Sequence, residues 1–237
     1  MHLSFQYGDT TIDFELSYSR RKTIAISVEA PGRVSVKAPL GLSEDEIINR
    51  VKSKARWIVQ KLYEVKNVKT IAVKKEFVNG ESFMYLGRNY SLQLIMDTKM
   101  RKPRVKLYQG KFMVATPSRE EEPIKKAMLN WYRKKAREQI NERIKYYQPK
   151  VGVQPARITV KEQKKRWGSC SSRGNLNFNW RAVMAPSPVL DYIIVHELCH
   201  LKHHTHSREF WNLLASILPD YKNRREWLKK NGVRLNL

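Results

Sequence analysis

The sequence predicts an α+β protein in which a β-rich N-terminal part, residues 1–117, precedes a mostly helical part, residues 118–237. Two patterns predict this division. Apolar and polar residues alternate over the first forty residues and again over 82–116, which is the period of half-buried strands. From about residue 123 onward, apolar residues recur at steps of three and four, as in amphipathic helices. With 237 residues, the chain can bury a core without disulfides.

The first elements expected are strands within the first forty residues. Gly8-Asp9 and Pro31-Gly32 separate the alternating runs, and both pairs are typical of tight turns. The pattern predicts antiparallel strands joined as hairpins. The alternating residues are Leu3, Phe5 and Tyr7, then Ile12, Phe14 and Leu16, then Ile24, Ile26 and Val28, then Val34, Val36 and Ala38.

A helix is expected next, followed by more strands. Ser43 and Glu46 have the spacing of a capping box, and helical spacing continues from there to about Val65. Strand-like runs return at 82–97 and 104–116, the second with a turn at Gln109-Gly110. No internal repeat is evident in the sequence.

The C-terminal part begins with a long amphipathic helix from about Pro123 to Gln148. Short strands are expected near 158–160 and 175–180. Ser187-Pro188 is typical of an N-cap and first helical residue, so a helix is predicted from there through His200. Two shorter helices fit residues 207–218 and 220–231.

The charge is the most unusual feature of the composition. The formal net charge is +24 with a pI near 10.1, and the excess is spread over both halves of the chain. Such a field attracts nucleic acid, nucleotides or acidic proteins, although a basic surface can also serve solubility alone. No apolar run is long enough for a membrane helix, no signal peptide is visible, and two cysteines are too few for a disulfide framework. We therefore expect a cytoplasmic protein with no membrane partner.

Residues 196–200 read His-Glu-Leu-Cys-His, an H-E-x-x-H motif. On a helix, His196 and His200 lie one turn apart on nearly the same face, so both imidazoles can reach one metal ion. Glu197 lies beside them and is the expected catalytic residue, because its carboxylate can activate a metal-bound water. The alternative is a pair of helix histidines with no metal.

A catalytic zinc site needs a third protein ligand and one open position. The candidates are His203, His204 and His206. On an unbroken helix His204 would lie too far along the axis from His196, and His203 would lie off the face. His206 precedes Ser207, an expected N-cap, and a turn there would fold it over the metal. We expect His196, His200 and His206 as ligands, with His203 and His204 solvated or supporting.

The stretch 166–211 resembles the signature of the YgjP-like metallopeptidases, relatives of the SprT-like and WLM-type zinc proteases. The resemblance is carried by RWGSC at 166–170, NW at 179–180, HELCH at 196–200 and HS-x-x-FW at 206–211. It implies a zincin-like fold, one zinc per chain on the three histidines, and Glu197 as the catalytic base. The family often has Asn before its third histidine, where this chain has Thr205.

Several other residues near the motif are candidates for a functional or a structural role. Arg166 and Arg181 are candidates to bind a substrate carboxylate or phosphate, or to form structural ion pairs. Cys199 is expected to be a buried filler, while Cys170 is a candidate thiolate near the metal. The tryptophans Trp167, Trp180 and Trp211 are expected to pack. A basic cluster precedes the motif and forms either a polyanion-facing rim or a solvated loop: Lys161, Lys164, Lys165, Arg166 and Arg173.

The leading functional prediction is a zinc metallopeptidase acting on a protein or peptide substrate. A first alternative is a metal-dependent nucleoside triphosphate pyrophosphatase or phosphohydrolase, which the basic charge would suit. A second is a nucleic-acid-binding module with structural zinc, against which the intact Glu197 argues. DNA and nucleotides are therefore candidate partners through the basic surface.

Overall fold

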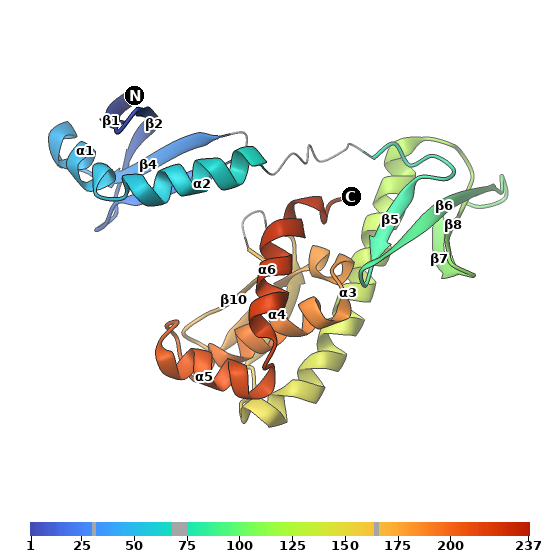
Figure 1. Cartoon of the computed structure of the whole chain (residues 1–237). Helices are drawn as coiled ribbons and strands as arrows, with labels where there is room; N and C mark the ends of the chain where they lie inside the picture. Colours follow the sequence, from blue (N-terminus) through green and yellow to red (C-terminus); the bar gives the residue numbers. More distant parts are fainter. Residues whose placement is uncertain (30–31, 68–74, 164–165) are drawn as a thin grey trace. The chain divides into compact units, whose positions relative to one another are not determined.

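A computed structural model describes residues 1–29, 32–67, 75–163 and 166–237 of the chain (Figure 1). Its contacts divide the chain into two compact units, Met1–Ile71 and Ala72–Leu237. Among the described residues, no helix is both long and apolar enough to cross a bilayer.

The first unit contains a four-stranded sheet in the order β1-β2-β4-β3. Its strands are β1 (His2–Tyr7), β2 (Thr10–Ser19), β3 (Ala25–Glu29) and β4 (Arg33–Pro39). The two hairpins β1–β2 and β3–β4 are antiparallel as predicted, but the central pair β2–β4 is parallel. Alternation indicates strands and faces, and it does not indicate which strands become neighbours. The predicted turn at Pro31-Gly32 includes Pro31, which lies outside the described residues.

Two helices follow this sheet where one was predicted. The capping box is present, because the Ser43 hydroxyl accepts the Glu46 amide and the Glu46 carboxylate accepts the Ser43 amide. However, α1 (Glu44–Lys52) is followed by Ser53 as its C-cap residue, and the Ser53 hydroxyl donates to the Arg50 carbonyl. The second helix, α2 (Ala55–Asn67), begins two residues after Ser53. The polar residues Ser53 and Lys54 separate the two helices. The spacing of the apolar residues continues across this junction, so it predicted a single helix.

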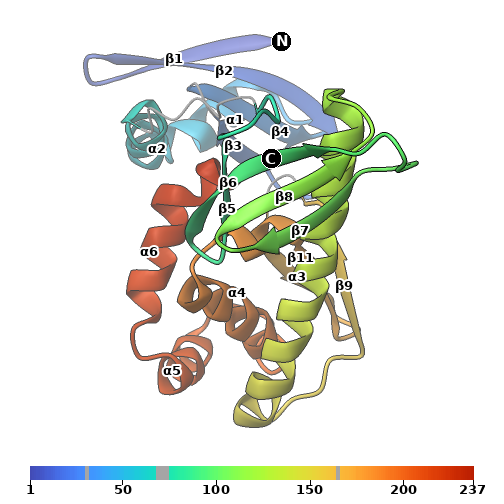
Figure 2. The ribbon, with the colours of Figure 1, turned by 90° about the vertical axis from the view of Figure 1, so that its right-hand side faces the viewer.

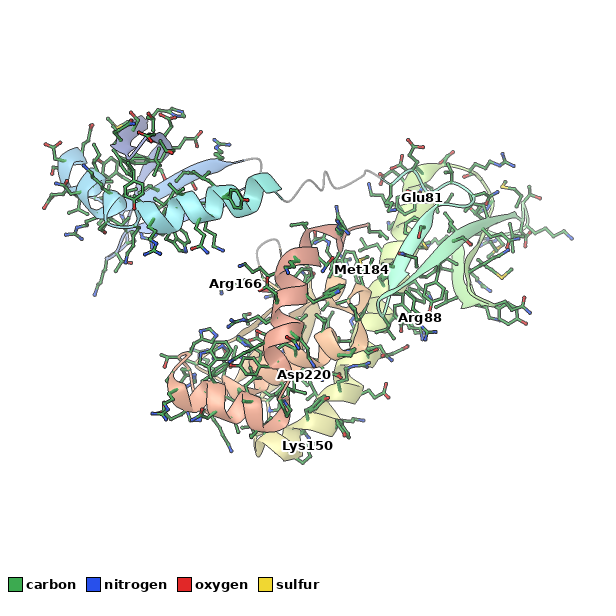
Figure 3. All side chains as sticks on the ribbon, in the orientation of Figure 1. Glu81, Arg88, Lys150, Arg166, Met184 and Asp220 are labelled. Carbon is green, nitrogen blue, oxygen red and sulfur yellow. The ribbon has the colours of Figure 1, made fainter. Side chains whose placement is uncertain are left out.

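The second unit opens with another four-stranded sheet, in the order β5-β6-β8-β7. Its strands are β5 (Ser82–Tyr85), β6 (Arg88–Met96), β7 (Arg104–Tyr108) and β8 (Lys111–Thr116). The predicted turn at Gln109-Gly110 is confirmed, with positive φ values of 46° and 74°. The turn between β5 and β6 rests on a 3-10 helix, η1 (Trp180–Met184), because the Gly87 amide donates to the Met184 carbonyl (Figure 3, where Met184 and Arg88 mark the place).

The two sheets repeat one topology, although the sequence predicts no repeat. In each, two antiparallel hairpins flank a central parallel pair, and a helix follows the fourth strand. Leu16 pairs with Val36 in the first sheet, and Leu94 pairs with Val114 in the second. The two valines are both fully buried. What repeats is the strand order and the alternation, which a search for identical residues does not detect.

The long helix α3 (Glu121–Val151) contributes one face to the core of the second unit. Figure 2 shows it passing behind the β5–β8 sheet and continuing along α4. Its predicted apolar face is buried, and it ends at Gly152 in the left-handed conformation. The apolar residues of β5–β8 belong to the same core as that face. Residue 117 falls between strand β8 and helix α3, and three further strands follow that helix among the described residues, whereas the compact units divide at 71/72.

The rest of the second unit combines a small sheet with three helices. The sheet has the order β10-β11-β9, with β10 at an edge, antiparallel to β11, and β9 parallel to β11. An ion pair of 2.9 Å between Arg143 Nε and Asp191 Oδ1 joins α3 to α4. The elements are β9 (Arg157–Lys161), β10 (Gly168–Cys170), β11 (Asn175–Asn179), α4 (Ser187–Cys199), α5 (Arg208–Ile217), α6 (Tyr221–Asn231) and a final 3-10 turn, η2 (Gly232–Arg234).

The bounds of α4 differ slightly from the predicted ones. Pro186 takes the N-cap position and Ser187 is the first helical residue, so the expected side-chain cap is absent. The helix ends at Cys199, and His200 is its C-cap residue with α-helical φ and ψ. The one-residue shift leaves His196 and His200 one turn apart.

Candidate metal centre

Three histidine rings converge at the C-terminal end of α4. The Nε2 atom of His196 lies 3.2 Å from Nε2 of His200 and 3.1 Å from Nε2 of His206. Ligand atoms of all three lie within 4.8 Å of one another, so this group could hold a metal ion. His196 and His200 are half-buried and His206 is exposed, which leaves the cluster open on one side.

The turn after α4 orients the His200 ring. The His203 amide donates to the Cys199 carbonyl, so the chain curls back directly after the helix. The His203 carbonyl then lies 3.0 Å from His200 Nδ1. A proton on Nδ1 would be donated to this oxygen, which leaves the Nε2 lone pair facing the other two rings.

Aromatic packing and a helix cap position His206. The Ser207 hydroxyl accepts the Phe210 amide at 3.5 Å and begins α5, as predicted. Trp211, one turn into that helix, stacks on the His206 ring with centroids 5.4 Å apart and an interplanar angle of 20°. Trp211 therefore packs, as predicted, but it packs on a residue of the cluster. Neither His203 nor His204 belongs to the group of three.

Two of the separations between the histidine nitrogens match those expected for ligands of a tetrahedral metal ion. Ligands about 2.0–2.1 Å from zinc, at tetrahedral angles, are separated from one another by about 3.3 Å. The two Nε2 separations around His196 are close to that value. Burial, reinforced by the neighbouring His200 and His206, lowers the pKa of His196 to about 3. The ring is thus neutral at physiological pH, which is the form that binds metal.

Glu197 is buried beside the cluster, with 6% of its surface exposed. Burial raises the pKa of its carboxyl to about 8, and the positive charge of Arg166 opposes this rise. Strand β10 crosses immediately next to it. A Cβ atom added at Gly168 would lie 2.5 Å from both Cγ and Oε1 of Glu197, so any other residue there would force the Glu197 side chain or the strand to shift.

Sequence reasoning did not assign a role to Gly168. Its φ is not in the left-handed region, so no turn signature indicates it, and the requirement for glycine comes from a residue 29 positions away in the sequence. The one available signal was its place within the RWGSC motif at 166–170.

The two cysteines are free thiols. Burial raises the pKa of Cys199 to about 12, and the side chain belongs to the core as expected. Burial and the nearby Glu197 raise the pKa of Cys170, and its thiol lies 3.4 Å from the Ser171 carbonyl. Its environment thus disfavours the thiolate that a metal would bind.

Arg166 and Arg181 line a cavity of about 620 Å³ together with Trp167 and Asn179. Arg181 is 2.9 Å from the Glu162 carboxylate and its guanidinium lies 4.8 Å from the centre of the Trp180 ring, so it forms a structural ion pair. Arg166 is exposed and contributes positive charge near Glu197 (labelled in Figure 3).

The basic cluster is only partly described. Lys164 and Lys165 lie outside the described residues. The other three members, Lys161, Arg166 and Arg173, are exposed. Trp180 is 1% exposed and belongs to the core, as expected for a packing residue.

Three comparisons with known proteins were made: with family models, with curated proteins and with solved structures. The family model of the YgjP-like, metallopeptidase domain matches residues 22–231. Among solved structures, the metallopeptidase zymogen abylysin of Pyrococcus abyssi is similar over 37% of this chain and 89% of that chain, with 22% sequence identity and a TM-score of 0.35. The search of curated proteins found no match. Because the family model spans most of the sequence, the chain belongs to the YgjP-like metallopeptidase family.

Proposed function

We propose that this protein is a zinc-dependent peptidase with one zinc per chain, held by the Nε2 atoms of His196, His200 and His206 in a zincin-like site. The observation that carries the proposal is the convergence of three histidine ligand atoms, together with the burial of Glu197, the residue that follows His196 on α4. Three protein ligands and an open fourth side are typical of catalytic rather than structural zinc. The exposure of His206 supplies that open side.

When bound, zinc supplies a Lewis acid for the scissile carbonyl and lowers the pKa of water at the open position. The carboxylate of Glu197 accepts the proton of the attacking water and later delivers it to the leaving amine. The positive charge of a bound metal ion near Glu197 would favour the ionised form of this carboxylate and would offset the effect of burial on its pKa. The His203 carbonyl fixes the orientation of the His200 ring throughout.

The position of β10 supports a peptide as substrate. This strand is at the edge of its sheet and its residue Gly168 lies against Glu197. An edge strand offers backbone N–H and C=O groups to an extended peptide, which holds its carbonyl groups in a regular row. Of the two arginines that could instead bind a triphosphate, Arg181 is already paired with Glu162, which leaves Arg166.

The free thiols Cys170 and Cys199 support a reducing compartment, and we propose the cytoplasm as the location.

A comparison of substrate classes tests the proposal. Zinc-loaded protein is incubated with a library of quenched fluorescent peptides and with denatured protein, and in parallel with nucleoside triphosphates under assay for phosphate and pyrophosphate. We expect peptide cleavage and no nucleotide hydrolysis. Nucleotide hydrolysis alone would establish the phosphohydrolase alternative through Arg166, and salt-dependent DNA binding without any hydrolysis would establish the binding module.

A further inference from the structure

A second cavity lies in the same unit and shares no residue with the histidine cluster. It has a volume of about 600 Å³ and lies between strand β7 and helix α3. From α3 it is lined by one face of the helix: Ala127, Asn130, Trp131, Lys134 and Lys135. From the sheet it is lined by Pro103, Val105, Lys106 and Leu107 of β7 and its approach, with Tyr85 of β5. We call this cavity the β7–α3 groove.

Strand β7 offers a free backbone edge to the groove. Within the described part of the chain, its only strand neighbour is β8. A two-residue turn, Gln109-Gly110, joins the two strands, so Tyr108 and Lys111 form the hydrogen-bonded pair next to it. Hydrogen-bonded and non-hydrogen-bonded pairs alternate along an antiparallel ladder. Val105 and Leu107 therefore direct their backbone N–H and C=O groups outward, away from β8.

The floor of the groove is apolar and closely packed. The Trp131 ring makes edge-to-face contacts with Tyr85, Phe112 and Tyr132, with centroids 5.0, 4.8 and 5.2 Å apart. Val105 and Leu107 are half-buried and pack against the same core. An extended chain lying beside β7 would place every second side chain on this floor.

The charged groups around the groove are mainly positive. Lys106 and Lys134 are exposed, and Lys106 Nζ lies 4.3 Å from the centre of the Tyr108 ring. Lys135 is 2.7 Å from the Glu138 carboxylate, one turn further along α3. These lysines would attract acidic side chains and would repel a second copy of this basic strand.

We propose that the β7–α3 groove binds an extended acidic segment of a partner protein, which adds to β7 as a further strand. Backbone hydrogen bonds to Val105 and Leu107 would supply affinity, apolar side chains would rest on Trp131, and acidic side chains would meet Lys106 and Lys134. A nucleic-acid strand fits less well. It cannot form a backbone ladder with β7, and three edge-to-face contacts already engage the Trp131 ring that a base would stack on.

The test measures binding of a fluorescent peptide of alternating glutamate and valine by anisotropy. The full-length Glu197→Gln variant is used, so that cleavage does not compete with binding and the result does not depend on the proposed catalysis. The Lys106→Glu/Lys134→Glu double variant reverses two groove charges, and we expect at least about a tenfold loss of affinity for it. Lys145→Glu is the matched control, because Lys145 is exposed on α3 and does not line the groove. We expect affinity close to that of the parent protein for this control.

Two further peptides test whether the bound segment is a strand. One carries N-methyl groups on its odd residues and the other on its even residues, so each removes half of the amide donors. Addition to β7 uses the donors of one set only, so one peptide should lose binding and the other should keep it. Equal binding of both, equal loss in the lysine double variant and the Lys145→Glu control, or tight binding of oligothymidylate in place of the peptide would overturn the proposal.

Discussion

At Gly168 the backbone of β10 lies so close to Glu197 that an added Cβ atom would be 2.5 Å from Cγ and Oε1 of that side chain. The histidines could be selected from their spacing, because a helix brings residues four apart onto one face. His206 could be selected because Ser207 signals a turn. Gly168 could not, because its constraint is a close approach between β10 and the Glu197 side chain. Helical and strand periodicity carry no information about such a contact.

The first prediction concerns this contact. Gly168→Ala places a methyl group against Glu197, so the carboxylate or the strand must shift. We expect a loss of stability of about 1–3 kcal/mol, the usual cost of an added methyl group in a packed site. We also expect activity to fall while zinc is retained, because no ligand is displaced. Thermal unfolding, zinc content and peptide cleavage are measured, with Ser172→Ala, an exposed residue of the turn after β10, as control. Unchanged activity in Gly168→Ala would show that Glu197 tolerates displacement.

The second prediction separates the ligand histidines from their neighbours. His206→Ala removes one of three nitrogen donors, so zinc affinity should fall by more than about 100-fold, because the loss of a supporting partner alone typically costs about 10–100-fold. His204→Ala should retain zinc, because this side chain is outside the group of three. Elemental analysis after dialysis against a competing chelator compares the two variants. Equal loss in both would be inconsistent with His206 as the third ligand.

The periodicity of apolar residues predicted which segments form strands and which form helices. It did not predict where these elements end or which strands pair. The face of α3 was predictable because buried residues recur at helical spacing along all of it. The break between α1 and α2 was not, because Ser53 and Lys54 interrupt the helix without glycine or proline. The parallel pairing of β2 with β4 depends on long-range packing rather than on either strand's own sequence.

The third prediction concerns the cap that joins the metal cluster to α5. Ser207→Ala removes the acceptor for the Phe210 amide. We expect a loss of about 1 kcal/mol of stability, typical of an N-cap serine. Zinc affinity should also fall, because His206 immediately precedes the cap. Ser216→Ala, which removes a hydroxyl near the other end of α5, is the control. Chemical denaturation and a zinc titration are the measurements, and a stability loss without any change in zinc affinity would separate the cap from the cluster.

At the scale of the whole molecule, the spacing of apolar residues indicated an α+β chain, and the structure has two units with a repeated four-strand topology. The boundary at 71/72 was not predictable, because the change from strands to helices near 117 is the stronger signal in the sequence. The β5–β8 sheet packs on α3 through ordinary core residues such as Phe112 and Tyr132, whose ring centroids lie 5.8 Å apart. Only their contact shows that they share one core.

The fourth prediction concerns the net charge of +24. If the basic cluster at Lys161, Lys164, Lys165, Arg166 and Arg173 meets a polyanion, binding of labelled duplex DNA should fall steeply with salt, by about 0.9 log units per log unit of salt for each phosphate contact. Anisotropy across a salt series measures this, with little dependence on base sequence expected. Changing the five residues to Ser should reduce the slope. Binding that ignores salt, or an unchanged slope in the variant, would identify the cluster as a solvated surface.

The fifth prediction tests the central claim, that Glu197 acts as the base beside a zinc held by three histidines. Glu197→Gln preserves the shape of the side chain and removes its basicity. Zinc content and peptide cleavage are measured on the same samples of the parent protein and the variant. We predict about one zinc per chain in both proteins, and a loss of at least about 10²-fold in the cleavage rate of the variant. Full cleavage activity in zinc-loaded Glu197→Gln would contradict the account.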